Sequence, residues 1–288
     1  LAFVPERIDP GVPQHTVHNT PKVVGGMTPR CTEVATAVLA TLGTSVMAVS
    51  SPRVAELTKL LENVFRAVNI ALVNELAVLC EQMGIDVWEV IAAASTKPFG
   101  FLPFWPGPGV GGHCIPVDPW YLAWKAREYD FPTRFIELAA EVNQRMPQHV
   151  VDLVVRALEG DGASLAGADI LVLGVAFKPN VDDPRHAPAD RVIALLAARG
   201  ARVRYHDPHI ARFRAGGDVF LPAPLALASE PLTPSSVAAA DAVVILVAHD
   251  AVDHAVVTRH ARLVVDACNA TAGLDGPARV VRLGAPAG

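Results

Sequence analysis

The second half of the chain alternates short apolar runs with helix-like segments, and this alternation most constrains the fold. The run at 168–177 is almost continuously apolar, which is typical of a strand buried on both faces of a parallel sheet. Further strands are expected over 202–205, 242–247 and 263–266, with helices over 189–199 and 235–239. Such alternation predicts a doubly wound α/β sheet that binds ligands beyond the carboxyl ends of its strands. Polar residues stand at three of these ends: Lys178, His206-Asp207 and His249-Asp250.

A long helical pattern precedes the alternating region. Apolar residues recur three or four positions apart over 51–83, and Gly84 offers a stop for the helix. A helix of this length exceeds the interior of a small domain, so we expect it to bridge two α/β parts and to pack against a second subunit. Further helices are expected over 86–94, 119–129 and 134–158.

The start of the chain carries only short strand-like runs, at 1–4, 22–24 and 45–49, around one helix-like run at 30–42. This pattern predicts the tail of an α/β domain and not a whole one. The uncharged stretch at 34–52 is long enough to cross a membrane, but its Thr, Ser and Gly content favours a helix, a turn and a strand. We therefore expect three parts: residues 1–50 from an α/β domain, a helical domain over 51–160 and a doubly wound sheet over 161–288.

Composition excludes several kinds of partner. The 288 residues carry a net charge of −5, which argues against non-specific binding of nucleic acid or of an anionic membrane. The four cysteines form no Cys-x-x-Cys pair and no cluster with histidine, so we expect no metal site and reduced thiols in the cytoplasm. We expect Cys31, Cys80 and Cys268 to be small buried side chains.

Cys114 stands apart because it lies in a loop rich in glycine and proline, with Asp118 four residues on. Glycines let backbone N–H groups approach a ligand closely, and a thiol beside such donors can be held partly as the thiolate that attacks carbonyls. Gly107, Gly109 and Gly112 also fit the pattern G-x-G-x-x-G. We reject a dinucleotide fingerprint there, because a proline-broken segment precedes them in place of a strand.

Two motifs carry a family resemblance. The sequence Gly-Gly-His-Cys-Ile-Pro-Val-Asp-Pro at 111–119 resembles the active-site loop of the UDP-glucose/GDP-mannose dehydrogenase family. It most resembles the branch that oxidises UDP-N-acetylglucosamine and UDP-N-acetylmannosamine. The sequence Gly-Val-Ala-Phe-Lys-Pro-Asn-Val-Asp-Asp-Pro-Arg at 174–185 resembles the family's nucleotide-sugar domain. The resemblance implies a UDP-sugar substrate, NAD as cofactor, a homodimer and a role in making surface-polysaccharide precursors.

The resemblance also implies catalytic roles for five residues. Cys114 would be the nucleophile. Lys59 and Asn63, which share one helical face, would stabilise an oxyanion at C6 of the sugar, although by themselves they also fit a solvated polar face. Glu6, within Pro-Glu-Arg, would position or activate water. Asp118 would assist it, although an Asp before a proline equally suits the cap of a helix.

Binding roles follow from the same resemblance. Lys178 would pair with the diphosphate. Arg185 would reach a phosphate of the cofactor, and an ion pair with Asp182 or Asp183 is the alternative for this side chain. Further residues expected at the substrate are Phe104, Gly109, Gly111, Gly112 and Phe177.

The implied reaction oxidises the C6 alcohol twice. A first hydride goes to NAD⁺, Cys114 captures the aldehyde as a thiohemiacetal, and a second hydride leaves a thioester. Water, aided by Glu6 or Asp118, then hydrolyses the thioester to the uronate. A thiol suits this sequence because a thiohemiacetal can still donate hydride and a thioester is readily hydrolysed.

The chain departs from the family pattern in three respects. The NAD-binding half with the true G-x-G-x-x-G is largely missing, so residues 1–50 resemble only its end. Ala187 stands where the family usually has serine, and Cys268 where it usually has arginine. The alternatives left open are a UDP-glucose 6-dehydrogenase and a non-catalytic module for UDP-sugar binding or dimerisation. A cysteine hydrolase using Cys114 and His113 lacks an evident orienting acid.

Overall fold

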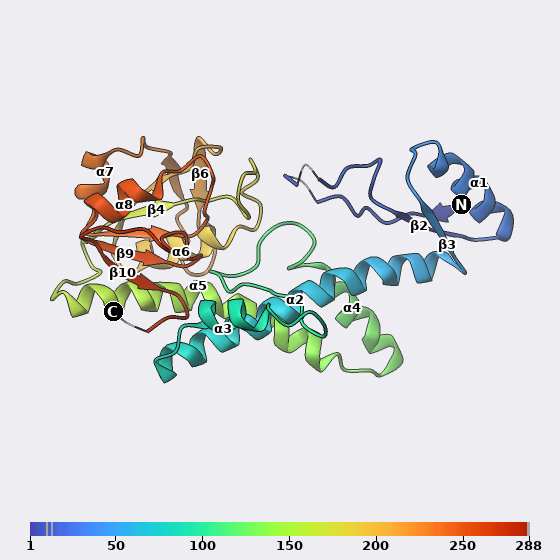
Figure 1. Ribbon diagram of the computed structural model, residues 1–288, viewed down its shortest axis with the longest axis horizontal. Coiled ribbons are helices and arrows are strands. Elements are labelled where there is room, and N and C mark those ends of the chain that lie inside the picture. The colour runs from blue at the N-terminus through green and yellow to red at the C-terminus, as the bar shows by residue number, and fades with distance from the viewer. Residues whose placement is uncertain (10, 13, 287–288) are drawn as a thin grey trace. The chain divides into compact units, whose positions relative to one another are not determined.

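The structure is a computed structural model that describes residues 1–9, 11–12 and 14–286 (Figure 1). The chain divides into two compact units. The first unit comprises Leu1–Arg66 with Asp118–Pro132, and the second comprises Ala67–Val117 with Thr133–Gly288.

The first unit begins with a small sheet and one helix. Its strands are β1 (Ala2–Phe3), β2 (Lys22–Gly26) and β3 (Val46–Val49), and the central strand β2 runs parallel to β3 and antiparallel to β1. Helix α1 (Pro29–Ala40) packs beside β2, and its N-cap Thr28 accepts a hydrogen bond from the N–H of Cys31. The helix, turn and strand predicted for the uncharged stretch are therefore confirmed.

Helix α2 (Pro52–Met83) is one continuous helix that supplies residues to both units (Figure 1). Its bounds agree with the predicted helix within one residue. One window of α2 has a mean hydropathy of 1.4, so this helix is long and apolar enough to span a membrane by length and composition alone. Core helices of soluble proteins pass the same test, and 39% of the window is buried in the structure.

Three shorter elements and a long helix follow α2 before the second sheet begins. They are α3 (Val87–Ala94), α4 (Asp118–Ala126), the 3-10 helix η1 (Arg127–Tyr129) and α5 (Arg134–Gly160). The segment between α3 and α4, which carries Cys114, forms no helix or strand. The absence of a strand before the glycines confirms that this run is not a dinucleotide fingerprint.

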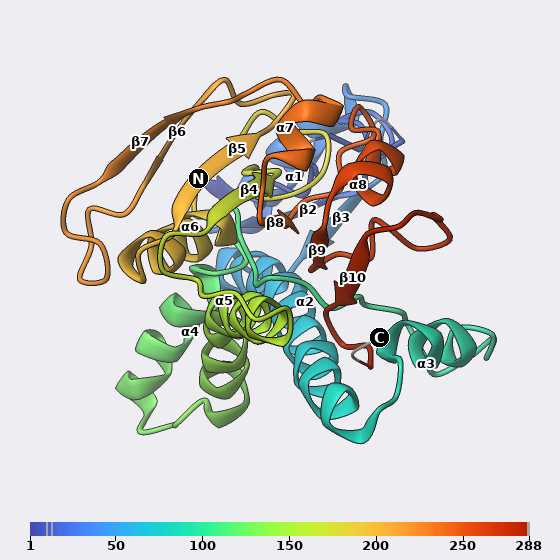
Figure 2. The ribbon, with the colours of Figure 1, turned by 90° about the vertical axis from the view of Figure 1, so that its left-hand side faces the viewer.

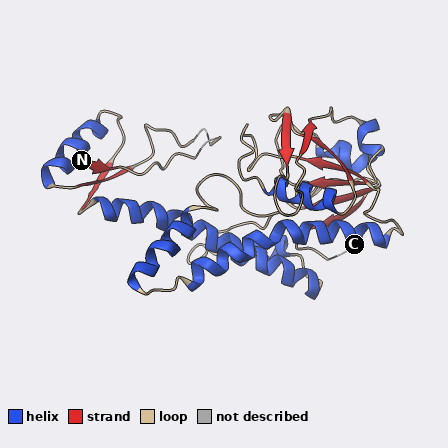
Figure 3. Ribbon diagram, turned by 180° about the vertical axis from the view of Figure 1, so that it is seen from behind, coloured by secondary structure: helices blue, strands red, loops and turns tan. Residues whose placement is uncertain are grey.

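The second unit is built on a parallel sheet with strand order β10-β9-β8-β4-β5 (Figure 2). Alternate residues of β4 enter two different cores. Ile170 and Val172 pack with residues of α5 and α6, whereas Leu171 and Leu173 pack with residues of α7 and α8. Helices on both faces of a parallel sheet make the doubly wound fold that was predicted. Figure 3 draws these helices in blue and the strands in red. The bounds are β4 (Asp169–Leu173), α6 (Pro188–Ala198), β5 (Arg202–His206), α7 (Pro234–Ala238), β8 (Ala242–Ile245), α8 (His254–His260), β9 (Leu263–Asp266) and β10 (Arg279–Arg282).

Several short elements of the second unit are additional to the predicted ones. Strands β6 (Arg212–Ala215) and β7 (Leu225–Ala228) form an antiparallel pair of their own. Helix α8 and the edge strand β10 also lacked a sequence signal. Each has only four to seven residues, so its conformation depends on the neighbour it packs against more than on its own pattern.

The cysteines differ from expectation at two positions. Cys80 is buried as predicted, whereas Cys268 is only half-buried. Desolvation of its thiol and the Asp266 carboxylate raise the pKa of Cys268 well above its usual range. Cys31 is only half-buried, and the prediction of a buried side chain is wrong there because α1 buries none of its residues. The Thr28 hydroxyl donates a hydrogen bond to Sγ of Cys31 over 3.2 Å, and the amino group of Leu1 donates a second over 3.2 Å. Together they lower the pKa of this thiol to about 7.

Candidate active site

Asn63 and Asp118, two of the predicted catalytic residues, touch in the first unit. Asn63 is fully buried on α2, and its Nδ2 donates a hydrogen bond to Oδ2 of Asp118, the first residue of α4. Arg66 donates from Nη2 to Oδ1 of the same amide. The amide therefore has a fixed orientation, because its oxygen and nitrogen have different partners. Nδ2 carries a second hydrogen, the kind of donor that oxyanion stabilisation requires.

Glu6 lies in the first unit among backbone donors and cations. Its Oε1 accepts the N–H groups of Arg7 and Ile8, each at 2.7 Å, and lies 3.9 Å from Nζ of the buried Lys22. The hydrogen bond from Ile8 has the largest effect, and with the N–H of Arg7 and the charges of Lys22 and Lys59 it lowers the pKa of this exposed carboxylate. Glu6 is thus an ionised carboxylate at neutral pH, suited to orienting water. Lys22 was not among the predicted site residues. It is the first residue of an apolar strand, and a buried lysine is unusual there.

The loop that carries Cys114 is held in the second unit by two buried amides. The N–H of Gly107 donates to Oδ1 of Asn74 on α2 over 3.0 Å. Nδ2 of Asn74 donates to Oδ1 of Asn143 on α5 over 2.9 Å, and Nδ2 of Asn143 donates to the carbonyl of Ala67 over 3.0 Å. Neither asparagine was predicted. Their signal in the sequence is a polar residue at an otherwise apolar helical position, which does not reveal the partner.

Pro147 leaves one backbone carbonyl of helix α5 without its usual intrahelical donor, next to the loop that carries Cys114. Proline has no N–H, so the carbonyl of Asn143, four residues earlier, cannot receive the usual intrahelical bond. Gly109 lies directly against this carbonyl: a Cβ on Gly109 would stand 3.3 Å from it and 3.4 Å from Pro147. The φ of Gly109, +134°, is a second reason for glycine. This predicted ligand-binding glycine therefore also allows the loop to pack.

Gly111 and Gly112 pack against the predicted nucleotide-binding motif. A Cβ on Gly111 would lie 2.9 Å from Cβ of Phe177, and a Cβ on Gly112 would lie 3.0 Å from the Phe177 ring. The N–H of Gly112 donates to the carbonyl of Arg185 over 3.2 Å, so this N–H is used within the protein. The structure thus brings the predicted substrate-binding residues Gly111, Gly112 and Phe177 together. Gly112 lies two positions before the half-buried Cys114 in the sequence.

Arg185 forms the ion pair that was the alternative to a cofactor contact. Its Nε lies 2.9 Å from Oδ1 of Asp183 and its Nη2 lies 2.6 Å from Oδ2. This bidentate contact raises the pKa of Arg185 and lowers that of Asp183. Lys178 lies in the same motif as Arg185, at 174–185, and its Nζ is 5.7 Å from the centre of the Phe177 ring.

Phe104 packs against a hydrophobic cluster of α2 and α3 that includes Trp88. Nε1 of Trp88 donates to the carbonyl of Leu283 over 2.7 Å. The Trp88 ring stacks on Trp105, with centroids 5.6 Å apart. Phe104, which was predicted at the substrate, and its neighbour Trp105 therefore lie against α3, and α3 is joined through Trp88 to the chain after β10. Trp88 was not predicted as part of this arrangement.

The two positions that depart from the family pattern have structural surroundings. Ala187 is the N-cap of α6, is 3% exposed and makes no side-chain hydrogen bond there. Cys268 lies past the end of β9, and the next residue, Asn269, accepts a hydrogen bond from Nη1 of Arg282 over 2.9 Å. Among the described residues, no group of three or more His, Cys, Asp and Glu side chains could hold a metal ion.

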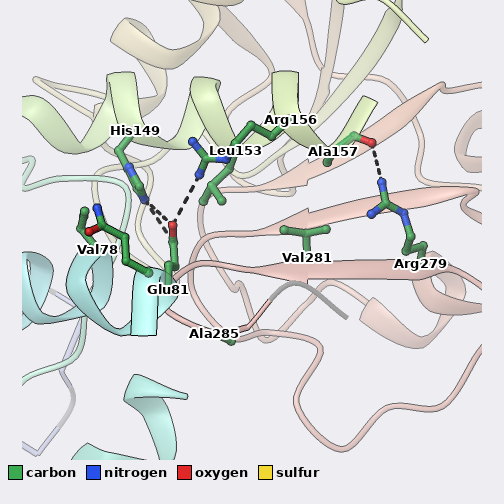
Figure 4. Close-up of a pocket in the computed structure, with 10 residues that line it drawn as sticks. Val78, Glu81, His149, Leu153, Arg156, Ala157, Arg279, Val281 and Ala285 are labelled. Atoms are coloured by element: carbon green, nitrogen blue, oxygen red, sulfur yellow. Dashed lines mark hydrogen bonds and ion pairs between the residues drawn. The ribbon is translucent and has the colours of Figure 1, made fainter. Parts of the chain in front are cut away.

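A separate cavity of 410 Å³ lies between α2, α5 and β10 (Figure 4). On its wall, Glu81 lies 3.0 Å from Nε2 of His149 and 3.5 Å from Nη2 of Arg156, and it accepts the N–H of Gly284 over 3.0 Å. These contacts fix the chain after β10 to the helices. None of the predicted site residues lines this cavity, so we assign the chemistry to the Cys114 loop and not to this cavity.

Two family models match the chain. Residues 53–145 match the central domain of the UDP-glucose/GDP-mannose dehydrogenase family, and residues 171–273 match its UDP binding domain. The chain belongs to the UDP-glucose/GDP-mannose dehydrogenase family. The central-domain match contains Lys59, Asn63, Phe104, Cys114 and Asp118, the UDP-binding match contains Phe177, Lys178 and Arg185, and Glu6 lies outside both.

Individual relatives agree with this assignment. A UDP-N-acetyl-D-mannosamine dehydrogenase of Methanocaldococcus jannaschii is 36% identical over 213 residues, which cover 74% of this chain and 48% of the relative. An NDP-N-acetyl-D-galactosaminuronic acid dehydrogenase of Ralstonia nicotianae is 38% identical over 211 residues, 73% of this chain and 48% of the relative. A solved UDP-D-ManNAc dehydrogenase from Pyrococcus horikoshii has a TM-score of 0.84 at 29% identity and covers 98% of this chain and 64% of that one. The chain spans about half the length of the curated relatives it matches.

This member of the UDP-glucose/GDP-mannose dehydrogenase family therefore carries two groups of polar residues. The second unit holds the thiol of Cys114 beside the segment with Phe177 and Lys178. The first unit holds the Asn63–Asp118 pair and the ionised carboxylate of Glu6.

Proposed function

We propose that this chain carries the substrate-binding and thiol-bearing parts of a nucleotide-sugar 6-dehydrogenase whose substrate is a UDP-N-acetylhexosamine. The supporting observation is the contact of Phe177, within the UDP-binding match, with Gly111 and Gly112 of the Cys114 loop. A sugar linked to a diphosphate at Lys178 would then have its reacting carbon near the thiol. The names of the relatives, which act on N-acetylated sugars, support the N-acetylhexosamine.

In this proposal Cys114 acts on the aldehyde at C6. Its sulfur forms a bond to the carbonyl carbon, and the carbonyl oxygen takes up a proton to give a thiohemiacetal. Asn63 and Lys59 serve as donors to the oxygen at C6. After oxidation to the thioester, water attacks the same carbon, the carbon–sulfur bond breaks, and the thiol of Cys114 is restored. Glu6 and Asp118 orient that water and accept its proton.

Both oxidations require a hydride acceptor, and the family resemblance implies NAD. The described residues do not fit a dinucleotide by themselves. Gly25 and Gly26 are the last two residues of β2, shortly before α1. A Cβ on Gly25 would meet the carbonyl of Ser51 at 2.1 Å, and one on Gly26 would meet the backbone nitrogen of Thr32 at 2.4 Å. The two glycines therefore allow close packing of the chain itself. The roles proposed for this chain are those of its own thiol, amide, lysine and carboxylates.

Replacing Lys178 tests the diphosphate contact. We expect Lys178→Met to weaken binding of UDP-N-acetylglucosamine by about 10- to 100-fold, because a charge-assisted hydrogen bond to phosphate contributes about 1.5–3 kcal/mol. Isothermal titration calorimetry measures both affinities, and Lys125→Met on the exposed side of α4 serves as the matched control. Equal affinities for wild type and Lys178→Met would contradict the assignment. Titrations with UDP-N-acetylmannosamine and UDP-glucose rank the sugars.

We also propose that the chain forms a homodimer through α2. This helix exposes an apolar stripe with helical spacing, more than scattered surface residues would give. The stripe consists of Val54, Leu57, Leu61, Phe65, Leu72, Leu76, Leu79 and Met83.

Charges on this stripe should separate the subunits. We expect the double variant Leu72→Lys/Leu76→Lys to be a monomer by light scattering after size-exclusion chromatography, whereas wild type is a dimer, because a buried unpaired ammonium is costly at an interface. Val219→Lys, at the 86%-exposed tip between β6 and β7, should leave the dimer intact. A wild-type monomer, or a dimer that survives both lysines, would exclude α2 as the interface.

A further inference from the structure

A buried histidine lies close to the nucleotide-binding segment without a role in the chemistry above. His249 is 1% exposed and follows the end of β8. The backbone N–H of Asn180 donates to its Nδ1 over 3.0 Å, and its Nε2 lies 3.1 Å from Oδ2 of Asp207. A backbone amide can only donate, so Nδ1 carries the lone pair. The proton is therefore on Nε2, which donates to the carboxylate.

Asp207 holds one end of the segment that contains Lys178. Its Oδ2 accepts the N–H groups of Val175 and Ala176 over 2.8 and 3.3 Å. The same carboxylate is 3% exposed and receives His249. The imidazole and the start of the segment are therefore fixed by one anion.

Asn180 holds the other end of the segment. Its φ of +61° is a left-handed conformation that Asn tolerates better than most residues. Its Nδ2 donates to Oδ2 of Asp250 over 2.8 Å, and the N–H of Asp250 donates back to Oδ1 over 3.0 Å. With the bond from its own N–H to His249, Asn180 is joined to two consecutive residues after β8. Lys178 thus lies between two fixed points, at Asp207 and at His249-Asp250.

The fixed segment also supports the thiol loop. The N–H of Phe177 donates to the carbonyl of Asp183 over 3.0 Å, and Phe177 lies against Gly111 with its Cβ and against Gly112 with its ring. A shift of this segment would therefore move both the diphosphate contact and the surface on which the Cys114 loop rests.

We propose that Asp207, His249 and Asn180 form a positioning network that holds Lys178 for the diphosphate and Phe177 beneath the thiol loop. This inference rests on the proposed UDP-sugar binding. The three residues touch neither diphosphate nor sugar in this scheme. They act by pre-ordering a segment that would otherwise lose conformational freedom on binding, which lowers affinity.

The test compares binding of UDP by wild type, His249→Phe and Asn180→Ala. Phenylalanine keeps the ring but neither accepts from Asn180 nor donates to Asp207. Alanine removes the side-chain pair with Asp250 and disfavours the left-handed backbone. We expect each variant to bind UDP about tenfold more weakly by calorimetry. Asn180→Gly, which keeps the backbone conformation and the bond to His249, should lose less, and His260→Phe on the exposed end of α8 should lose nothing.

A double-mutant cycle separates positioning from general destabilisation. If His249 acts through Lys178, the double variant His249→Phe/Lys178→Met should bind UDP no more weakly than Lys178→Met alone. Losses that add, or wild-type affinity in both His249→Phe and Asn180→Ala, would overturn the inference. Circular dichroism establishes that each variant folds. If His249→Phe does not fold, the surface variant Asn180→Ala provides the test. A wild-type chain that fails to bind UDP would overturn the proposed function and this inference together.

Discussion

Trp88→Ala should lower the free energy of unfolding by about 4 kcal/mol, the range found when a buried tryptophan is truncated to alanine. Trp88 is 8% exposed and packs with Val73, Ala77 and Ile91. Truncation leaves a cavity in this cluster and removes the donor to the carbonyl of Leu283, a loss that adds about 1–3 kcal/mol when the acceptor stays buried. Urea unfolding at one fixed protein concentration measures the change, because dimer stability depends on concentration.

Two further variants separate the contributions of packing and of the hydrogen bond to this loss of stability. Trp88→Phe keeps most of the packing and loses the N–H, so we expect a cost of about 1–2 kcal/mol. Trp105→Ala removes only the stacked partner, which is 46% exposed, and should cost about 1 kcal/mol. A cost below about 1.5 kcal/mol for Trp88→Ala would show that α3 and the chain after β10 are not joined through this residue.

Asp207→Asn should cost about 3 kcal/mol at neutral pH, because the carboxylate accepts four backbone N–H groups and the imidazole N–H of His249. In asparagine an NH₂ group replaces one carboxylate oxygen, so a donor would face the backbone N–H groups that this oxygen accepts. Asp253→Asn is the matched control, since Asp253 is an exposed N-cap of α8 and asparagine caps helices equally well.

The same carboxylate predicts a dependence of stability on acid. Burial raises the pKa of Asp207, but the hydrogen bonds from His249 and from the N–H groups of Val175 and His209 outweigh it and lower the pKa to about 2. A lowered pKa stabilises the fold above the unfolded value, near 3.8, and this stabilisation is lost as the pH falls toward 2. The contribution is about 2 kcal/mol. Unfolding curves between pH 4 and 2 should therefore converge for wild type and Asp207→Asn, and parallel curves would contradict the assignment.

Much of the fold follows from patterns that are local in sequence. The apolar spacing of α2, the buried runs of β4, β8 and β9, and the glycine that ends α2 all lie within single elements, so periodicity alone reveals them. Strand β10 is different. Its sequence, Arg-Val-Val-Arg, is short and charged at both ends, and its extended conformation comes from pairing with β9.

The contacts at the candidate site likewise fall into those that the sequence predicts and those that only the folded chain reveals. The Asn63–Asp118 contact joins two residues that the family motifs already mark, and the Cys114 loop is contiguous in sequence. Asn74 and Asn143 are 69 residues apart, and Asn180 and His249 are likewise separated by 69 residues. A single buried polar residue reveals that it has a partner but not which one, so these positioning contacts could be found only in the folded chain.

The most direct test of the account measures alkylation of Cys114 with and without UDP-N-acetylglucosamine. Iodoacetamide labelling followed by peptide mass spectrometry gives the rate at each cysteine. Cys31, half-buried with a pKa of about 7, is a reactive internal reference far from Cys114 in the sequence. We predict that saturating UDP-sugar slows labelling of Cys114 at least about tenfold and leaves Cys31 unchanged, because in the proposed function the nucleotide segment and the thiol loop bind one substrate. If calorimetry shows the UDP-sugar bound while Cys114 is labelled at the same rate with and without it, the thiol does not belong to the nucleotide-sugar site.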